Sequence, residues 1–293
     1  MDDGVLRRDS GPLTLDEVAQ YRRDGYVVLR GALGARLVEA CKQALSGLAS
    51  GRIPRRDTLI MMETGYKLED IEPEKRELFV RKYMDFVEDA PALKAAAMGR
   101  RLHAALDQIL GTGRVLFQEM ALVKPPRIGA DKPWHQDCSY FRITDPGLVV
   151  GVWIALDPAL RQNGCMEVIP GTHLRGAVPH VHENDFNRCR IVESFVHAER
   201  AVPIEMQPGD ALIFSGLLHH FTATNHSDLT RRAVQFHYHQ AGAVWGTLEE
   251  HQRHYRDAAG RYAGCTVPHA DRPSNYVYRA GLPRPVVPME EPA

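Results

Sequence analysis

Polar and apolar positions alternate at the helical period along most of the first third of the chain. Thr14 followed three residues later by Glu17 forms a capping box, which predicts a helix over 15–24 that Gly25 is placed to end. Apolar side chains at helical spacing predict a second helix over 35–49. The pattern therefore indicates two amphipathic helices near the start of the chain.

The same helical period returns further on. Residues 67–110 alternate charged and apolar positions, with an interruption near Pro91. A short apolar run at 26–29 predicts a single strand among these helices. Residues 13–112 are therefore expected to form a helical part.

From Val115 onward the pattern changes to short apolar runs bounded by Gly, Pro, Asn and Asp. Runs of this length are typical of strands, and they predict an all-β sandwich or barrel over 113–240. Helices followed by many short strands indicate an α+β domain. The predicted strands lie in RVLFQEMALV, WHQDCSYF, GLVVGVWIAL, CMEVI, DALIF and RRAVQFHY.

No internal repeat or low-complexity tract divides the chain, so a single domain over 1–293 is expected. The last eleven residues hold four prolines, which favours an extended or flexible tail over 283–293. Residues 1–12 are expected to form a second flexible tail, and 241–282 a helical and loop extension.

The composition is that of a globular protein with a sizeable core, because 44% of the 293 residues are hydrophobic and 25% are charged. Lys and Arg number 36 against 37 Asp and Glu, which gives a net charge of −1, and no run of basic residues forms a stripe. We therefore expect neither nucleic acid nor a membrane as the partner. The oligomeric state is left open.

The cysteines bear on the compartment. Five is an odd number, and no C-x-x-C spacing occurs, which argues against a disulfide framework and a structural zinc site. The first residues contain no apolar stretch of the signal-peptide kind, and nowhere do 18 apolar residues run together. A reducing, cytoplasmic location is expected. The five are Cys41, Cys138, Cys165, Cys189 and Cys265.

His135 and Asp137 stand two residues apart in a strand-like run, so their side chains could face the same metal ion. The spacing alone carries little weight, because two other pairs repeat it in polar, turn-like segments. Aromatic residues flank His135, and their packing favours the rigid setting that a pair of ligands needs. The two other pairs are His226 with Asp228 and His269 with Asp271.

A third ligand must come from elsewhere in the chain. The segment GDALIFSGLLHHFTATN supplies His219 and His220 at the end of an apolar strand. The alternative pair is His237 and His239, which alternate along FHYH and share one face. Any one of these histidines can equally be a buried, hydrogen-bonded core residue, so the spacing leaves the choice open.

Several of these motifs, in this order, resemble the phytanoyl-CoA dioxygenase family of iron(II)- and 2-oxoglutarate-dependent oxygenases. The resemblance covers roughly residues 13–240, and the segments that carry it are LDEVAQYRRDGYVVLRGAL, WHQDCSYF, GVWIALDPALRQNGCMEVIPGTHLRG and GDALIFSGLLHHFTATNHSDLTRRAVQFHY. It implies a double-stranded β-helix, which is a cupin-like jelly-roll, with a helical layer packed on one sheet. It also implies iron(II), 2-oxoglutarate and dioxygen as cofactor and cosubstrates.

Carried over residue by residue, the resemblance makes His135, Asp137 and His220 the iron ligands, with His219 facing away. Phe221 and Ala223 depart from the small residues that the family usually has after the distal histidine. Arg231 stands at the spacing of the arginine that pairs with the distal carboxylate of 2-oxoglutarate, and its planar guanidinium suits a carboxylate. The other implied cosubstrate residues are Lys82, Gln118, Met120, Trp153 and Thr222.

The alternation of residues along the predicted strand supports Arg231 over its neighbour. Arg231, Ala233, Gln235 and His237 share a polar or small face, whereas Arg232 shares its face with Val234, Phe236 and Tyr238. The alternative to a cosubstrate role is that Arg231 forms an ordinary ion pair at the surface. Without the resemblance, Met120 and Trp153 would be core residues and Lys82 a solvated charge on a helix.

The function implied by the resemblance is oxidation of an unactivated C–H bond of a small metabolite, coupled to decarboxylation of 2-oxoglutarate to succinate. Asp137 occupies the carboxylate position that related halogenating sites replace, so hydroxylation is the default outcome, with desaturation, ring formation and epimerisation as variants. Two alternatives remain: a jelly-roll metal hydrolase or isomerase without 2-oxoglutarate, and a non-catalytic binding module. Candidate substrate walls are the segments around Met61, Met62 and Tyr66, over 178–200, and over 245–255.

Overall fold

The computed structural model describes residues 11–182, 189–261 and 263–265. The predicted tail over 283–293 lies outside these ranges, as does the His269 and Asp271 pair, and so does the tail over 1–12 except for its last two residues. Among the residues that the structure describes, no helix is both long and apolar enough to cross a membrane.

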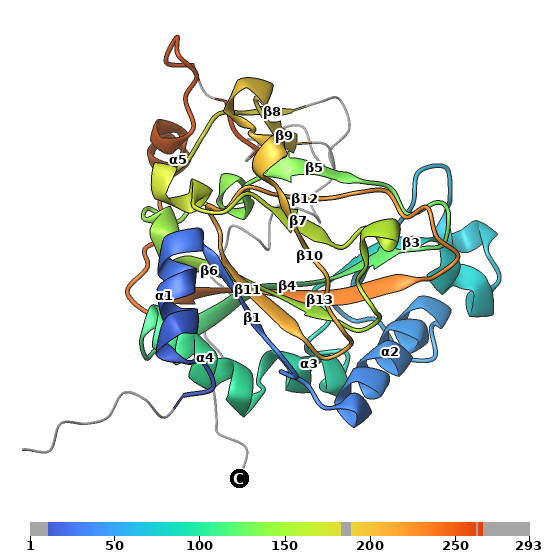
Figure 1. Ribbon diagram of the computed structural model, residues 1–293. Coiled ribbons are helices and arrows are strands. Elements are labelled where there is room, and N and C mark those ends of the chain that lie inside the picture. Colours follow the sequence, from blue (N-terminus) through green and yellow to red (C-terminus); the bar gives the residue numbers. More distant parts are fainter. Residues whose placement is uncertain (1–10, 183–188, 262, 266–293) are drawn as a thin grey trace, which may run out of the picture.

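Seven antiparallel strands form the larger sheet, in the order β1-β11-β6-β13-β4-β3-β2 (Figure 1). A smaller sheet in the order β10-β7-β12-β5 lies over one face of it, and β8 pairs with β9 in a separate hairpin. The large sheet contains β1 (Tyr26–Leu29), β2 (Leu59–Met62), β3 (Val80–Met84), β4 (Arg114–Lys124), β6 (Val149–Ala155), β11 (Ala211–Ser215) and β13 (Arg231–Gln240). The others are β5 (Lys132–His135), β7 (Met166–Val168), β8 (His180–His182), β9 (Cys189–Ile191), β10 (Val202–Ile204) and β12 (His220–Thr222).

Helices α2, α3 and α4 cover the opposite face of the large sheet (Figure 1) and share one core with it. The capping box of Thr14 and Glu17 begins the first helix, and Gly25, with φ of 85°, ends it, as the sequence predicted. The helices are α1 (Leu15–Asp24), α2 (Ala35–Ser50), α3 (Pro91–Ala97), α4 (Arg100–Leu110) and α5 (Leu248–His254).

The alternation of side chains along the central strands divides the core into two layers. Val152 and Phe236 pack toward the helices with Leu45 and other residues of α2 to α4. Trp153 and its neighbours on the other face pack toward the smaller sheet. The predicted fold class, an α+β jelly-roll with a helical layer on one sheet, is therefore confirmed.

The prediction of helix throughout 67–110 is wrong at residues 80–84, which form strand β3. These residues pair with β2 on one side and β4 on the other, and Val80 and Tyr83 are fully buried. Tertiary pairing outweighs the local helical period here. Lys82 therefore lies on a strand rather than on a helix, and Pro91 begins α3, at a position where a missing N–H costs nothing.

The strand predicted over WHQDCSYF ends earlier than expected. It stops at His135, and Asp137–Tyr140 forms a single 3-10 turn. The Gln136 side chain holds this turn, because its Nε2 donates to the carbonyls of Gly176 and Leu217 and its Oε1 accepts from the N–H of Val178. Asp137 is thus positioned by a turn that a fully buried glutamine fixes.

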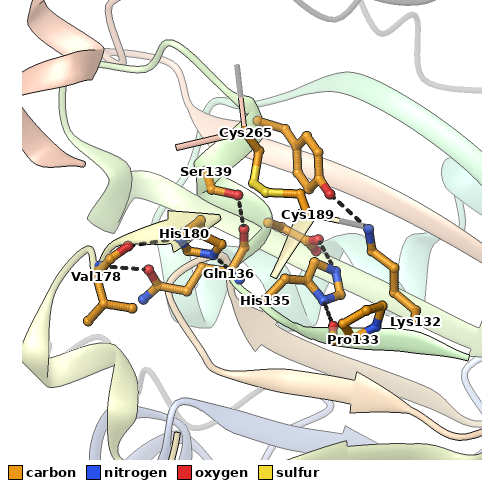
Figure 2. Close-up of a disulfide and its surroundings, with 11 residues drawn as sticks. Lys132, Pro133, His135, Gln136, Ser139, Val178, His180, Cys189 and Cys265 are labelled. Carbon is orange, nitrogen blue, oxygen red and sulfur yellow. Dashed lines mark hydrogen bonds and ion pairs between the residues drawn. A yellow bond between two sulfur atoms is a disulfide. The ribbon is translucent and has the colours of Figure 1, made fainter. Parts of the chain in front are cut away.

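A disulfide joins Cys189 on β9 to Cys265, which corrects the expectation that the cysteines remain unpaired. The two are 76 residues apart, so the spacing of cysteines along the chain does not reveal the pair. Figure 2 shows the bond beside Gln136 and His135. The other three cysteines are free and buried, and the cytoplasmic location stays a prediction.

Breaking this disulfide should destabilise the protein. Cys265→Ser is expected to lower the free energy of unfolding by about 2–4 kcal/mol, because the cross-link restricts the unfolded chain over a long loop. Denaturant titration measures the loss. Added reductant should lower the free energy of unfolding of the wild type by the same amount and leave that of the variant unchanged. A wild type that is indifferent to reductant would contradict the bond.

Two buried histidines should make the fold sensitive to acid. Burial, with Arg114 nearby, lowers the pKa of His103 to about 4, and burial lowers the pKa of His251 to about 4. The unfolded chain binds these protons near pH 6.5, so the free energy of unfolding should fall between about pH 6.5 and 4, by up to about 1.4 kcal/mol per pH unit for each histidine. Denaturant titrations across this range should show a shallower fall in His103→Gln, and an unchanged slope would refute the assignment.

Candidate metal centre

Three ligand atoms converge where β5 and β12 lie side by side. His135 and His220 are direct partners across these strands, with ring centroids 4.1 Å apart. Asp137 Oδ1 lies 3.4 Å from His135 Nε2 and 3.5 Å from His220 Nε2. Among the described residues, these three form the one group whose ligand atoms could hold a metal ion together.

Backbone carbonyls fix the orientation of both imidazoles. His135 Nδ1 lies 2.8 Å from the carbonyl oxygen of Pro133 (Figure 2), and His220 Nδ1 lies 2.9 Å from that of Leu218. With each Nδ1–H donated to a carbonyl, each Nε2 keeps its lone pair and points toward Asp137. This is the tautomer that a metal-binding histidine needs.

The electrostatics also favour a bound cation. Burial lowers the pKa of His135 to about 3, helped by the neighbouring His220, so the ring stays neutral. Burial by itself would raise the pKa of the Asp137 carboxyl, but the imidazoles of His220, His237 and His135 hold it well below its usual range. A buried carboxylate beside two imidazoles is therefore prepared for a divalent metal ion.

The donor set fits an octahedral ion with open positions. Neighbouring donors around such an ion, each about 2.1 Å from it, lie about 3 Å apart, which is close to the separations from Asp137 Oδ1. Two imidazoles and one carboxylate form the facial arrangement of non-heme iron(II) oxygenases. The residues present therefore fit iron, and three positions would stay open for other ligands.

Arg231 is a buried cation with no anionic partner among the described residues. Its side chain is 2% exposed, and its guanidinium carbon lies 5.2 Å from the centre of the Trp153 ring. Nη1 approaches the carbonyl of Leu122 at 3.4 Å and Nε has no hydrogen-bond partner, and no described carboxylate is in ion-pair range. Burial accordingly lowers the pKa of Arg231 to about 10. A carboxylate of a bound molecule would pair with this guanidinium.

The neighbouring Arg232 behaves as the alternation predicts. Its guanidinium makes two hydrogen bonds to Asp157, at 2.7 and 3.0 Å, and pairs with Glu77 at 3.2 Å. It therefore belongs to the outer face of the sheet, and Arg231 to the interior.

The other predicted cosubstrate residues gather on the same interior face. Register partners share a face of a sheet, and Gln235 of β13 pairs with Trp153 on one side and Met120 on the other. Gln118 pairs with His237 in the same ladder, and Lys82 of β3 pairs with Leu122. Buried Trp153 Nε1 and Gln118 Oε1 have no hydrogen-bond partner, so both can serve a polar ligand. Thr222 follows His220 by two residues on β12 and is also buried.

The departure at Phe221 has a structural explanation. Its ring stacks on Trp134, with centroids 5.4 Å apart and planes tilted by 23°. The stack fastens β12 to β5, so it supports the pairing of His220 with His135. Ala223 lies beside Gly164. A Cβ added to Gly164 would lie 2.3 Å from the carbonyl oxygen of Ala223, so the two backbones approach each other closely here.

No other histidine among the described residues joins the three-ligand cluster. His219 is buried with both ring nitrogens unpartnered, and His239 bonds a neighbouring backbone carbonyl. His173 lies against the carbonyl of Arg22, and Asp228 near His226 forms an exposed ion pair with Arg127. His237, one of the rival pair, instead contacts Asp137 directly.

Sequence reasoning missed the roles of Gln235 and Lys124 around the site, and it gave His237 only as an alternative metal ligand. Gln235 and His237 contact the Asp137 carboxylate, and the only signal for Gln235 was that it shares a face with Arg231. Lys124 is a buried register partner of Arg231, and its Nζ donates to the carbonyls of Ala130 and Thr222, which fastens β12 to β4. Burial, together with Arg231, holds the pKa of Lys124 well below its usual range.

Comparison with known proteins agrees with this geometry. The model of the family Phytanoyl-CoA dioxygenase (PhyH) matches residues 21–233. Peroxisomal phytanoyl-CoA dioxygenase of Mus musculus is 25% identical over 253 residues, 83% of this chain and 74% of the relative. Phytanoyl-CoA dioxygenase domain-containing protein 1 of Mus musculus is 32% identical over 138 residues, 45% of this chain and 47% of the relative.

Solved structures share the fold. EctD from S. alaskensis with bound Fe superimposes with a TM-score of 0.65 at 20% identity, covering 82% of this chain and 81% of that one. EvdO2 from Micromonospora carbonacea var. aurantiaca complexed with 2-oxoglutarate gives a TM-score of 0.62 at 21% identity, covering 82% of this chain and 96% of that one.

Proposed function

Because the chain belongs to the phytanoyl-CoA dioxygenase family, we propose that His135, Asp137 and His220 hold iron(II) in a 2-oxoglutarate-dependent oxygenase. The enzyme oxidises an unactivated C–H bond of a small organic metabolite, by default to an alcohol. One observation carries this proposal: a buried triad with metal-ligand geometry shares the jelly-roll interior with a buried arginine that has no carboxylate partner among the described residues.

The chain's own residues bind and orient the cosubstrate. Arg231 would pair with the distal carboxylate of 2-oxoglutarate and so set how far the molecule reaches toward the triad. Trp153 packs against the guanidinium and prevents it from turning away. Iron held by His135, Asp137 and His220 would supply the activation of dioxygen, with one oxygen atom used in the oxidative decarboxylation of 2-oxoglutarate to succinate and carbon dioxide and the other available to the substrate. The buried surroundings of His135 and Asp137 exclude bulk water from this chemistry.

The substrate that we propose is a free small metabolite rather than a polyphosphate conjugate. The chain has a net charge of −1 and no run of basic residues to receive several phosphates. Lys82 and Met61 are register partners at the edge of the interior face, which supports the segment around Met61 as one wall of the substrate site.

The proposal is tested by supplying purified protein with iron(II), 2-oxoglutarate and dioxygen and measuring succinate. Succinate should form only when all three are present, and replacing iron(II) with zinc(II) should abolish it. A chain that produces no succinate with iron, yet hydrolyses or isomerises a metabolite with zinc, would instead be a metal hydrolase or isomerase.

A further inference from the structure

The two oxygens of the Asp137 carboxylate have different surroundings. Oδ1 faces the two imidazoles of the proposed iron site, at 3.4 and 3.5 Å. Oδ2 accepts hydrogen bonds from Gln235 Nε2 at 3.0 Å and from His237 Nε2 at 2.8 Å. The carboxylate is therefore held from behind by two donors, and one oxygen alone is presented to the metal.

Both donors are buried and rigid. Gln235 is 3% exposed and His237 is fully buried, with the rings of Phe117 and Phe141 packed against His237. The nitrogens of the two donors are themselves 3.1 Å apart, so they reach Asp137 as a pair. Few alternative rotamers are open to side chains packed in this way, which makes the orientation of the carboxylate well defined.

The two donors also belong to the strand that carries Arg231. Residues 231, 235 and 237 lie on one face of β13, and this face packs toward the smaller sheet, as Ala233 between them shows. One strand thus supplies both the cation for the cosubstrate and the support for the carboxylate ligand. The metal position and the cosubstrate position are consequently fixed relative to each other by a single rigid element.

We propose that Gln235 and His237 are positioning residues that keep Asp137 a one-oxygen ligand of the metal. This inference rests on the proposed iron site. With Oδ2 occupied, the carboxylate cannot use both oxygens on the ion, so the positions needed by 2-oxoglutarate and dioxygen stay open. Gln235 and His237 act through Asp137 and bind neither the metal nor the cosubstrate.

The test measures metal affinity rather than activity alone. In anaerobic titrations of the apoprotein with iron(II), His237→Phe is expected to weaken binding by about 10- to 100-fold and Gln235→Leu by about 10-fold. His237→Gln should restore part of the loss, because an amide can donate to the same oxygen. His239→Phe is the matched control, since His239 stands two residues further along β13 and bonds a backbone carbonyl instead, and it should change affinity less than about threefold.

Spectroscopy separates positioning from mere stability. The visible band of the iron and 2-oxoglutarate complex should shift in energy in Gln235→Leu, and the melting temperature of the apoprotein shows whether each variant is folded. Unchanged iron affinity and an unchanged band in folded Gln235→Leu and His237→Phe would overturn the inference. If only this inference fails, the wild type still forms the visible band with iron(II) and 2-oxoglutarate. If the proposed function itself is wrong, the wild type does not form the band.

Discussion

Replacing Asp137 with alanine is expected to lower iron-dependent succinate formation by roughly a thousandfold or more, equivalent to about 4 kcal/mol in activation free energy. The variant removes the one anionic ligand of the triad and leaves only the two imidazoles, so iron(II) affinity should fall as well. It also leaves Gln235 and His237 as buried donors without their acceptor, which costs stability. Succinate release at saturating iron measures the first effect, and anaerobic titration the second.

The adjacent residue supplies the control. Cys138 follows Asp137 in the same turn, but its Sγ contacts the carbonyl of Pro146 and packs away from the triad. Cys138→Ser should therefore keep nearly all of the succinate formation, at most with a modest loss of stability. Full activity in Asp137→Ala would contradict the triad, and a comparable collapse in Cys138→Ser would show that any change in this turn inactivates the protein.

Removing the buried guanidinium should act on the cosubstrate rather than on the metal. Arg231→Ala is expected to raise the KM for 2-oxoglutarate by roughly 10²–10³-fold, because a buried, doubly hydrogen-bonded charge pair contributes about 3–4 kcal/mol. Iron(II) affinity in the absence of 2-oxoglutarate should remain close to that of the wild type. Arg231→Lys keeps the charge but loses the planar guanidinium that donates two parallel hydrogen bonds. Its KM for 2-oxoglutarate should therefore lie between those of the wild type and Arg231→Ala.

Arg232 offers a matched comparison on the opposite face of the same strand. Arg232→Lys weakens the contacts to Asp157 and Glu77, so it should lower stability without changing the KM for 2-oxoglutarate. An equal rise of the KM for 2-oxoglutarate in Arg231→Ala and Arg232→Lys would mean that Arg231 affects the cosubstrate only by stabilising the sheet. An unchanged KM in Arg231→Ala would remove the arginine from the cosubstrate site.

Local patterns predicted the elements whose signals are local. The capping box at Thr14, the glycine at its far end and the alternation around Arg231 each depend on a few neighbouring residues, and each has the predicted structure. The strand at 80–84 was missed because its pairing with β2 and β4 is long-range, and its own residues suit a helix equally well.

The site shows the same division. The spacing of His135 and Asp137 could be recognised within one segment, whereas the choice of His220 over His219 and His237 depended on resemblance rather than on pattern. Gln235, Lys124 and the pairing of Cys189 with Cys265 could not be predicted, because each acts through residues that are distant in the chain. Only the folded arrangement brings such partners together.

The most direct measurement is the absorption spectrum of the anaerobic protein with iron(II) and 2-oxoglutarate. A keto acid chelated to iron(II) held by His135, Asp137 and His220 should give a weak visible charge-transfer band, and Arg231→Ala should need far more 2-oxoglutarate to reach it. Absence of the band from wild-type protein saturated with both would contradict the account.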